Sequence, residues 1–253
     1  MGLGPLERRR SLCRIITTIN LQVGKKEKLV VLSGAGISAE SGLATFRGSD
    51  GLWEGHHIED VATPEAWRKN PERVLEFYNQ RRKQAFHAEP NRAHHIIREL
   101  EEFFDVVVLT QNVDNLHEKA GSRNIIHLHG QLFQCRSTKN ESIVVDMEGW
   151  ELNLGDLGPD GAQLRPHIVW FGEEVPMMGK AADEAETADI FVVTGTSMQV
   201  YPAASLIDFV PLHAQIFVID PAELRLRGGR SIQYFQENAT TGMEKLKAIL
   251  TGA

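Results

Sequence analysis

The stretch that decides the fold is "LVVLSGAGISAESGLATFRGSDGLW", residues 29–53. An apolar run ends at Gly34-Ala35-Gly36, and Ala39 follows. Small residues in this spacing after a strand are typical of the turn that binds a dinucleotide pyrophosphate. An ordinary dinucleotide-binding domain then has a second strand that ends in Asp or Glu about 20 residues later. Here the continuation is polar and loop-like, which argues against a dehydrogenase. Taken alone, the stretch also allows a glycine-rich turn without a ligand.

The composition bounds the class of protein. A chain of 253 residues holds one large domain, or one domain with a smaller insertion. The net charge of −7 argues against nucleic acid as a partner, and no apolar run approaches the roughly 18 residues that a membrane span needs. Only Cys13 and Cys135 are present, which excludes a disulfide framework and indicates a reducing, cytoplasmic location. Residues 1–28 form a leader with a basic start, predicted as a surface helix rather than a targeting peptide because Arg14 interrupts its apolar part.

Short apolar runs alternate with helical patterns along the rest of the chain. The runs, rich in Val and Ile, predict buried parallel strands at 29–33, 106–110, 125–129, 190–194 and 215–219. Helices are predicted at 70–86, 91–104, 179–188 and 240–250, the first with Asn70 as N-cap. This alternation predicts an α/β fold with a doubly wound parallel sheet. Two segments break it: 42–90, with helices but no strand, and 133–166, which is rich in turns. We predict that these two insertions form a small lobe.

Polar clusters follow several of the predicted strands. Gln111-Asn112-Val113-Asp114 follows one, His129 ends the next, and Gly195-Thr196-Ser197 follows a third. Because ligands of open α/β sheets bind beyond the carboxyl ends of the strands, we expect these groups to converge. His129 is the predicted base, since it stands at a strand end beside Gly130. Each cluster by itself is also compatible with turn or helix-cap chemistry.

Five stretches occur together in one order: "GAGISAESGLATFRG" (34–48), "TQNVDNLHEKAG" (110–121), "HLHG" (127–130), "RPHIVWFGE" (165–173) and "GTSMQVYPAA" (195–204). In these motifs the chain resembles the sirtuins, the NAD-dependent protein lysine deacylases. The resemblance covers residues 29–253 and implies a large Rossmann-like lobe beside the small lobe. It also implies that NAD is consumed as a co-substrate and that the partners are acylated lysine side chains of proteins.

The resemblance further implies a set of site residues. The acyl oxygen attacks the anomeric carbon of NAD, nicotinamide leaves, and His129 acts as the base on a ribose hydroxyl, with Asn112 and Asp114 as the other catalytic residues. The implied cofactor-binding residues are Gly34, Ala35, Gly36, Ile37, Ala44, Thr45, Phe46, Arg47, Gln111, Asn112, Val113, Asp114, Gly195, Thr196, Ser197, Asp220 and Ala239. The implied peptide-binding stretch is Val169, Trp170, Phe171, Gly172 and Glu173, which would pair with the substrate backbone.

Tyr78 and Arg81 lie three positions apart and so on one face of a predicted helix. The sirtuin class that prefers succinyl and malonyl groups carries this pair, and Ala62 fits the wider pocket of that class. Arg81 would then pair with the distal carboxylate of the acyl group, while Tyr78 donates a hydrogen bond. The plain alternative is a solvated basic helix face, since Arg82 and Lys83 follow.

The chain also departs from the family. Most sirtuins bind a structural zinc through two CxxC pairs, but Ser137 and Asn140 stand where the first pair would be, and the second has no cysteine. We therefore expect no zinc and no other metal. Apolar packing is expected in its place, from Ile143, Val145, Trp150, Leu152 and Leu154. At the adenosine end, Asp220 replaces the usual Asn, and Ala239 matches the family only weakly.

Two other activities compete with deacylation. Some relatives chiefly transfer ADP-ribose to protein or hydrolyse NAD, and the pair Tyr78 and Arg81 counts against these. A non-catalytic NAD-sensing module is the second alternative, and the presence of His129, Asn112 and Asp114 counts against it.

Overall fold

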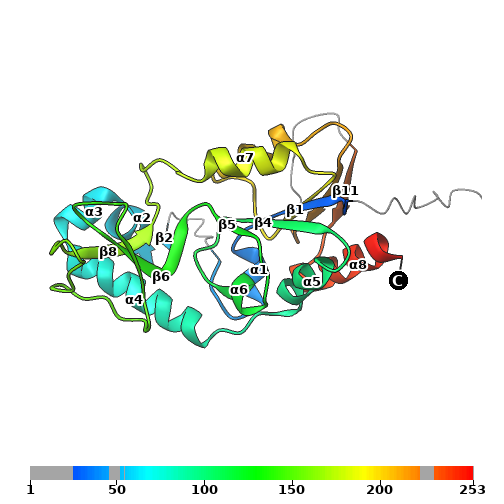
Figure 1. The fold of residues 1–253 in the computed structure, drawn as a ribbon. Coiled ribbons are helices and arrows are strands. Elements are labelled where there is room, and N and C mark those ends of the chain that lie inside the picture. The colour runs from blue at the N-terminus through cyan, green and yellow to red at the C-terminus, as the bar shows by residue number, and fades with distance from the viewer. Residues whose placement is uncertain (1–24, 46–51, 54, 223–230, 253) are drawn as a thin grey trace, which may run out of the picture.

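The computed structural model describes residues 25–45, 52–53, 55–222 and 231–252. Its largest feature is a sheet of six parallel strands in the order β11-β10-β9-β1-β4-β5 (Figure 1). The strands are β1 (Lys28–Ser33), β4 (Asp105–Thr110), β5 (Ile125–His127), β9 (Ile190–Thr194), β10 (Gln215–Ile219) and β11 (Ile232–Phe235). The predicted doubly wound α/β fold is confirmed, and five of the six strands fall on the predicted runs.

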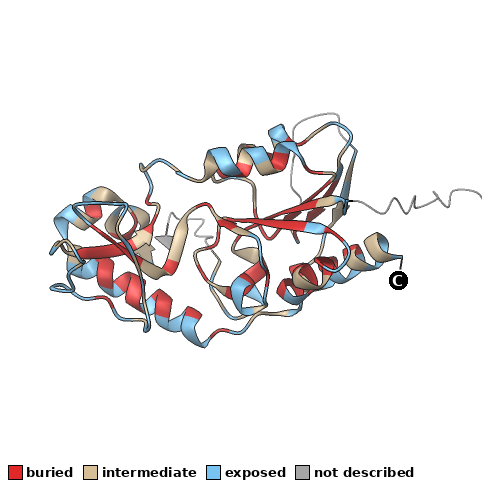
Figure 2. Ribbon diagram, viewed as in Figure 1, coloured by how far each residue is buried: buried red, intermediate tan, exposed pale blue. Residues whose placement is uncertain are grey.

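Both faces of the sheet are covered, which explains why its strands are apolar without interruption. Side chains alternate along β1: Leu29 and Val31 face α5 (Arg92–Leu100) and α8 (Ala239–Thr251) in one core. Val30 and Leu32 face α7 (Met178–Glu186) and the 3₁₀ segment η1 (Ala203–Phe209) in the other. Figure 2 shows the buried sheet between these two helical layers.

The chain reverses direction across the sheet beside β1. From β1 it runs outward to β4 and β5, and it then returns to β9 on the other flank of β1 before continuing to β10 and β11. Such a reversal opens a crevice at the carboxyl ends of the two neighbouring strands. The glycine turn after β1, with the short helix α1 (Gly36–Ala39), therefore meets the turn after β9.

The two segments that break the alternation pack against each other. The first contains α2 (Ile58–Val61), α3 (Pro64–Lys69) and α4 (Pro71–His87), and the second contains the antiparallel strands β6 (Gly130–Ser137), β7 (Val144–Asp146) and β8 (Leu164–Ile168). α4 begins as predicted, because the Asn70 side chain accepts a hydrogen bond from the Arg73 amide at 3.0 Å. The prediction of no strand in 42–90 is wrong: β2 (Leu52–Trp53) and β3 (His56–His57) form a small antiparallel ladder. Strands of two residues are too short to produce an apolar run.

A further, smaller core closes this part of the molecule. It contains Leu75, Cys135, Leu152 and Leu164, with Trp67, Val145 and Met147 packed against it. Val145 and Leu152 were predicted here, whereas Ile143 and Trp150 lie outside the cluster and Leu154 is 45% exposed. Ser137 belongs to a hydrogen-bonded turn instead, in which its hydroxyl donates to Asp160 at 2.6 Å and accepts from the Lys139 and Asn140 amides.

Polar contacts from α4 fasten the same region. Asn79 donates to the Leu152 carbonyl at 3.1 Å and accepts from the Leu152 amide at 2.9 Å. Arg82 is fully buried and donates through Nε to the Trp150 carbonyl at 2.8 Å. The predicted basic helix face is thus divided, because Arg82 points into the protein while the Lys83 ammonium lies over the Trp150 ring.

Two predictions fall on residues outside the described ranges. These are the leader helix, apart from residues 25–28, and the cofactor contacts of Phe46 and Arg47. Within the described ranges, no helix has the length and apolar character that crossing a bilayer requires.

Candidate functional site

A cavity of about 380 Å³ opens at the carboxyl ends of the strands and extends to α4. Nearly all of the predicted site residues line it. From the predicted cofactor set these are Gly34, Ala35, Gly36, Ala44, Thr45, Gln111, Asn112, Val113, Asp114, Gly195, Thr196, Ser197, Asp220 and Ala239. His129, Tyr78, Arg81 and the whole of 169–173 line it as well. Ile37 does not: its side chain is fully buried in the core beneath the turn, so its predicted cofactor contact is not seen.

Close contact between the turns after β1 and β9 shapes the floor of the cavity. A Cβ at Gly36 would stand 2.7 Å from the Gly195 Cα, and one at Gly195 would stand 2.2 Å from the Ile37 nitrogen. The amides of Gly34 and Gly36 donate to the carbonyls of Thr194 and Gly195. These glycines are therefore required for the two turns to meet. The hydroxyls of Thr196 and Ser197 line the cavity beside these turns and are groups that could bind a phosphate.

A buried hydrogen-bond network orients the two polar residues after β4. Asn112 donates through Nδ2 to the Ser38 hydroxyl at 3.1 Å, and Ser38 donates to Asp114 Oδ2 at 3.0 Å. The other oxygen of Asp114 accepts from the Leu116 amide at 3.1 Å. Burial raises the pKa of Asp114, although both hydrogen bonds act in the opposite direction. The network fixes the carboxyl and amide groups before any ligand enters.

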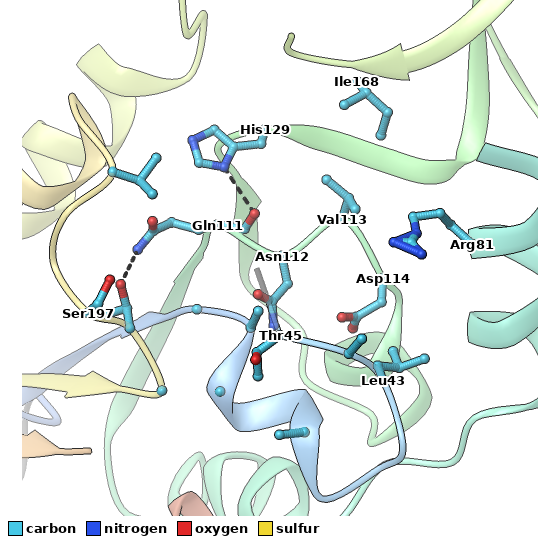
Figure 3. A pocket seen from close by; sticks show the side chains of 18 of the residues that line it. Leu43, Thr45, Arg81, Gln111, Asn112, Val113, Asp114, His129, Ile168 and Ser197 are labelled. Atoms are coloured by element: carbon cyan, nitrogen blue, oxygen red, sulfur yellow. Dashed lines mark hydrogen bonds between the residues drawn. The ribbon is translucent and has the colours of Figure 1, made fainter. Parts of the chain in front are cut away.

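His129 has the geometry of a general base. It stands in the connection after β5, and its Nδ1 lies 3.0 Å from the Gln111 carbonyl oxygen (Figure 3). Because a carbonyl can only accept, Nδ1 carries the hydrogen, and the neutral ring keeps its lone pair on Nε2. Burial lowers the pKa of His129, and the bond to Gln111 offsets this in part. The neutral, proton-accepting form is therefore favoured near neutrality.

The pKa of the neighbouring His127 is shifted in the opposite direction. Its Nδ1 lies 3.1 Å from the Asn112 carbonyl oxygen, and its Nε2 lies 2.6 Å from the Glu118 carboxylate. Burial acts to lower the pKa of His127, but the Glu118 carboxylate outweighs it and raises the pKa overall. His127 is thus suited to holding the Asn112 backbone, and His129 to accepting a proton.

The far end of the cavity is cationic. Arg81 reaches it from α4, opposite Val113 and Asp114 in Figure 3, with 7% of the residue exposed. Burial lowers the pKa of Arg81 to about 10, so the guanidinium remains charged at neutral pH. Tyr78 lies one turn earlier and is fully buried, and burial raises the pKa of its phenol. The two side chains provide a cation and a neutral hydroxyl to the same cavity.

The segment after β8 is less extended than predicted. Phe171 and Gly172 form a turn, in which Gly172 has a φ of 90°. The amides of Val169 and Phe171 donate to the carbonyls of His129 and Ala62. Phe171 is 44% exposed at the cavity mouth, whereas Trp170 is 2% exposed and the Glu173 carboxylate pairs with Arg165 at 2.7 Å. Within this stretch, the Phe171 side chain is therefore exposed, while the Trp170 side chain is buried and the Glu173 carboxylate is paired with Arg165.

Asp220 directly follows β10 and lines the cavity. It is 1% exposed, and its Oδ1 accepts from the Ala222 amide at 2.8 Å. Ala239 begins α8 and also lines the cavity, and next to it the Glu40 carboxylate accepts from the Thr240 amide at 3.0 Å. A carboxylate here is a suitable acceptor for ribose hydroxyls.

Sequence reasoning missed several residues of this site. Ser38 links Asn112 to Asp114, yet a serine in a small-residue turn carries no signal that separates it from its neighbours. The apolar wall near Arg81 includes Leu43, Leu132 and Ile168. Of these, Ile168 ends a strand that the apolar pattern did not predict.

The residues present fit a dinucleotide. The cavity is lined by the amides of Gln111 and Asn112, the hydroxyls of Thr196 and Ser197, and the carboxyl groups of Asp114 and Asp220. A metal ion has less support: within the part of the chain that the structure describes, no three His, Cys, Asp or Glu side chains gather as ligands.

Comparisons with known proteins agree with this geometry. The Sir2 family model matches residues 34–202. The chain is 52% identical over 220 residues to an "NAD-dependent protein deacylase" of Helicobacter pylori strain J99, covering 87% of this chain and 94% of that protein. A protein of the same description from Bacteroides thetaiotaomicron is 49% identical over 232 residues, covering 90% and 99%.

Among solved structures, a Sir2 homologue in complex with NAD superposes with a TM-score of 0.80 at 40% identity, covering 90% of both chains. The family model spans the glycine turn, the Asn112–Asp114 cluster, His129 and the turn after β9, so the chain belongs to the Sir2 family.

Proposed function

We propose that this chain is an NAD-dependent protein lysine deacylase with a preference for succinyl and malonyl groups. The observation that carries the proposal is one cavity that contains both the lone-pair nitrogen of His129 and the guanidinium of Arg81. The relatives described as NAD-dependent protein deacylases support the reaction, and Tyr78 and Arg81 support the acyl preference.

When bound, NAD supplies a glycosidic bond to a cationic leaving group, whose cleavage has an oxocarbenium-like transition state. The chain's own residues then act by position and charge. Asn112 and Asp114, held by Ser38, would orient polar groups at the nicotinamide end. Nε2 of His129 would accept a proton from a hydroxyl in the cavity, while Gln111 holds the ring.

The acyl end would recognise a carboxylate. A buried guanidinium that remains charged is a strong partner for an anion, because little water competes for it. The apolar side chains of Leu132 and Ile168 would line the path of the methylene groups. An acetyl group would gain no contact with Arg81.

The decisive experiment incubates the protein with NAD and acetyl-, malonyl- or succinyl-lysine peptides, and follows nicotinamide release together with peptide mass. The proposal requires loss of the acyl group with stoichiometric nicotinamide. NAD consumption without deacylation would instead favour ADP-ribosyl transfer or NAD hydrolysis. Binding of NAD without turnover would favour a sensing module.

The acyl preference is tested by Arg81→Met. We expect desuccinylation to fall by about 10- to 150-fold, since a charged hydrogen-bond pair contributes roughly 1.5–3 kcal/mol, while deacetylation is retained. Lys83→Met is the matched control, because it removes a cation from the same helix. The Lys83 ammonium lies over the Trp150 ring. An equal loss of both activities in Arg81→Met would reject the assignment.

We also propose that the fold needs no zinc. The Ser137 turn, the Leu152 core and the Asn79 and Arg82 contacts support this, because they fasten the region where the resemblance to sirtuins would place the zinc site. Prolonged treatment with a chelator should leave the melting temperature and the activity unchanged. Stoichiometric zinc in the purified protein, with unfolding on its removal, would refute the proposal.

A further inference from the structure

A buried hydrogen bond lies behind the acyl end of the cavity. Nε1 of Trp170 lies 3.1 Å from the Tyr78 hydroxyl oxygen and joins the segment after β8 to α4. An indole nitrogen can only donate, so the phenol oxygen is the acceptor. A phenol that accepts in this way retains its own hydrogen as a donor, and the indole restricts the directions in which that hydrogen points.

The indole is itself held from several sides. The Arg165 guanidinium lies 3.3 Å from the centroid of the Trp170 ring, and the Trp67 ring lies 5.9 Å away. The Trp170 amide donates to the Glu173 carboxylate at 2.8 Å, and Glu173 also accepts from Arg165 at 2.7 Å. Rotation of the indole would disrupt this arrangement. Its N–H is therefore in place before a substrate arrives.

We propose that Trp170 is a positioning residue for acyl selectivity. Through the Tyr78 hydroxyl it directs the phenol hydrogen toward the distal carboxylate of a succinyl or malonyl group bound at Arg81. The inference rests on the proposed acyl preference and adds a third determinant to Tyr78 and Arg81. An acetyl group has no distal carboxylate, so the orientation of Tyr78 matters for one class of substrate and not for the other.

Trp170→Phe tests the inference, because it keeps an aromatic ring on Arg165 and removes the N–H. We expect the KM for a succinyl-lysine peptide, relative to that for an acetyl-lysine peptide, to rise about two- to tenfold, the range for one hydrogen bond, with any change in kcat shared by both peptides. Trp67→Phe is the matched control, since it replaces a neighbouring indole of the same cluster by a smaller phenyl ring. It should leave the ratio of the two KM values unaltered. A loss of equal size for both peptides, or an unchanged ratio in Trp170→Phe, would overturn the inference.

A double-mutant cycle separates this inference from the proposed function. If Trp170 acts through Tyr78, then Trp170→Phe adds nothing further in a Tyr78→Phe background, whereas additive effects would reject the inference. Suppose that Tyr78→Phe and Arg81→Met reduce desuccinylation but Trp170→Phe does not. Then only the role of Trp170 fails. If the unmodified enzyme does not remove succinyl groups, the proposed preference fails and the role of Trp170 fails with it.

A measurement on the unmodified indole makes the test independent of whether Trp170→Phe folds. The chain has four tryptophans, so Trp53→Phe, Trp67→Phe and Trp150→Phe identify the indole N–H resonance of Trp170 by elimination in a ¹⁵N-tryptophan-labelled sample. We expect this resonance to move upfield and to exchange faster with solvent in Tyr78→Phe. A resonance that does not change would show that the hydrogen bond is absent in solution and would overturn the inference.

Discussion

At the scale of single residues, the tautomer of His129 leads to a prediction about pH. Only the neutral ring accepts a proton at Nε2, and burial lowers the pKa below the usual histidine value of 6.5. We therefore expect kcat/KM to rise with pH through an apparent pKa below 6.5 and to be level by neutrality, measured by deacylation at saturating NAD. An acidic limb centred above pH 7 would contradict this environment. His129→Asn provides the control, with an expected loss of about 10²–10⁴-fold in rate and little change in the melting temperature.

At the scale of elements, α4 depends on a lysine from another part of the chain. The Lys119 ammonium donates to the carbonyls of Ala85, Phe86 and Ala88, the last at 2.6 Å. It thus satisfies carbonyl groups at the C-terminus of the helix that carries Tyr78 and Arg81. We expect Lys119→Met to lower the free energy of unfolding by about 1–2 kcal/mol in urea denaturation. Lys180→Met, at an exposed position of α7, is the control and should change it by less than about 0.5 kcal/mol. Equal effects of the two variants would mean that the cap contributes nothing.

At the scale of the whole molecule, two buried histidines should make the fold sensitive to acid. His94 and His117 pack with their ring centroids 5.0 Å apart. Burial lowers the pKa of His94 to about 4 and that of His117 well below 6.5. Above pH 6.5 both are neutral in the folded and unfolded states, so they do not lower the free energy of unfolding there. As the pH falls from 6.5 toward 4, only the unfolded chain binds the protons, so the free energy of unfolding decreases by up to about 1.4 kcal/mol per pH unit for each histidine.

Urea unfolding of the wild type and of His94→Leu at pH 7.5, 6 and 5 checks this expectation. The wild type should lose stability more steeply than the variant, because the variant retains one of the two histidines. The comparison isolates the histidine contribution from that of Asp114, whose raised pKa acts in the opposite direction. Parallel pH profiles of the two proteins would show that the pKa of His94 is the same in the folded and unfolded states.

Much of the fold was predictable from sequence because its signals are local and strong. Strands buried on both faces are continuous apolar runs, and Asn70 and Asn91 mark helix starts by side-chain bonds that the structure contains. β11 was missed, since a partly exposed edge strand alternates polar and apolar residues. β6 to β8 were missed for a similar reason: they form a short antiparallel sheet in a polar segment.

The site residues that stand at the ends of strands were predictable from the sequence. The convergence of residues 111–114, His129 and 195–197 follows from parallel topology together with the family motifs. The contacts within the site did not follow. Neither the Ser38 link nor the Trp170–Tyr78 bond has a spacing that sequence reveals, because each joins elements whose relative placement only the folded chain defines. Ile37 was misplaced because the pattern of a tight turn does not reveal which side chains face inward.

The cavity that contains both His129 and Arg81 has one more consequence, for inhibitor design. Arg81 and Asp220 both line it, so a guanidinium and a carboxyl group are offered within one enclosure. A bisubstrate compound with a carboxylate tail at one end and a ribose diol at the other can engage both charges without leaving the protein interior. Once one end of the compound is bound, its other end is held near the second site at a high effective concentration. Such a compound should discriminate against relatives that lack either charge, since the unmatched end would bury a polar group without a partner.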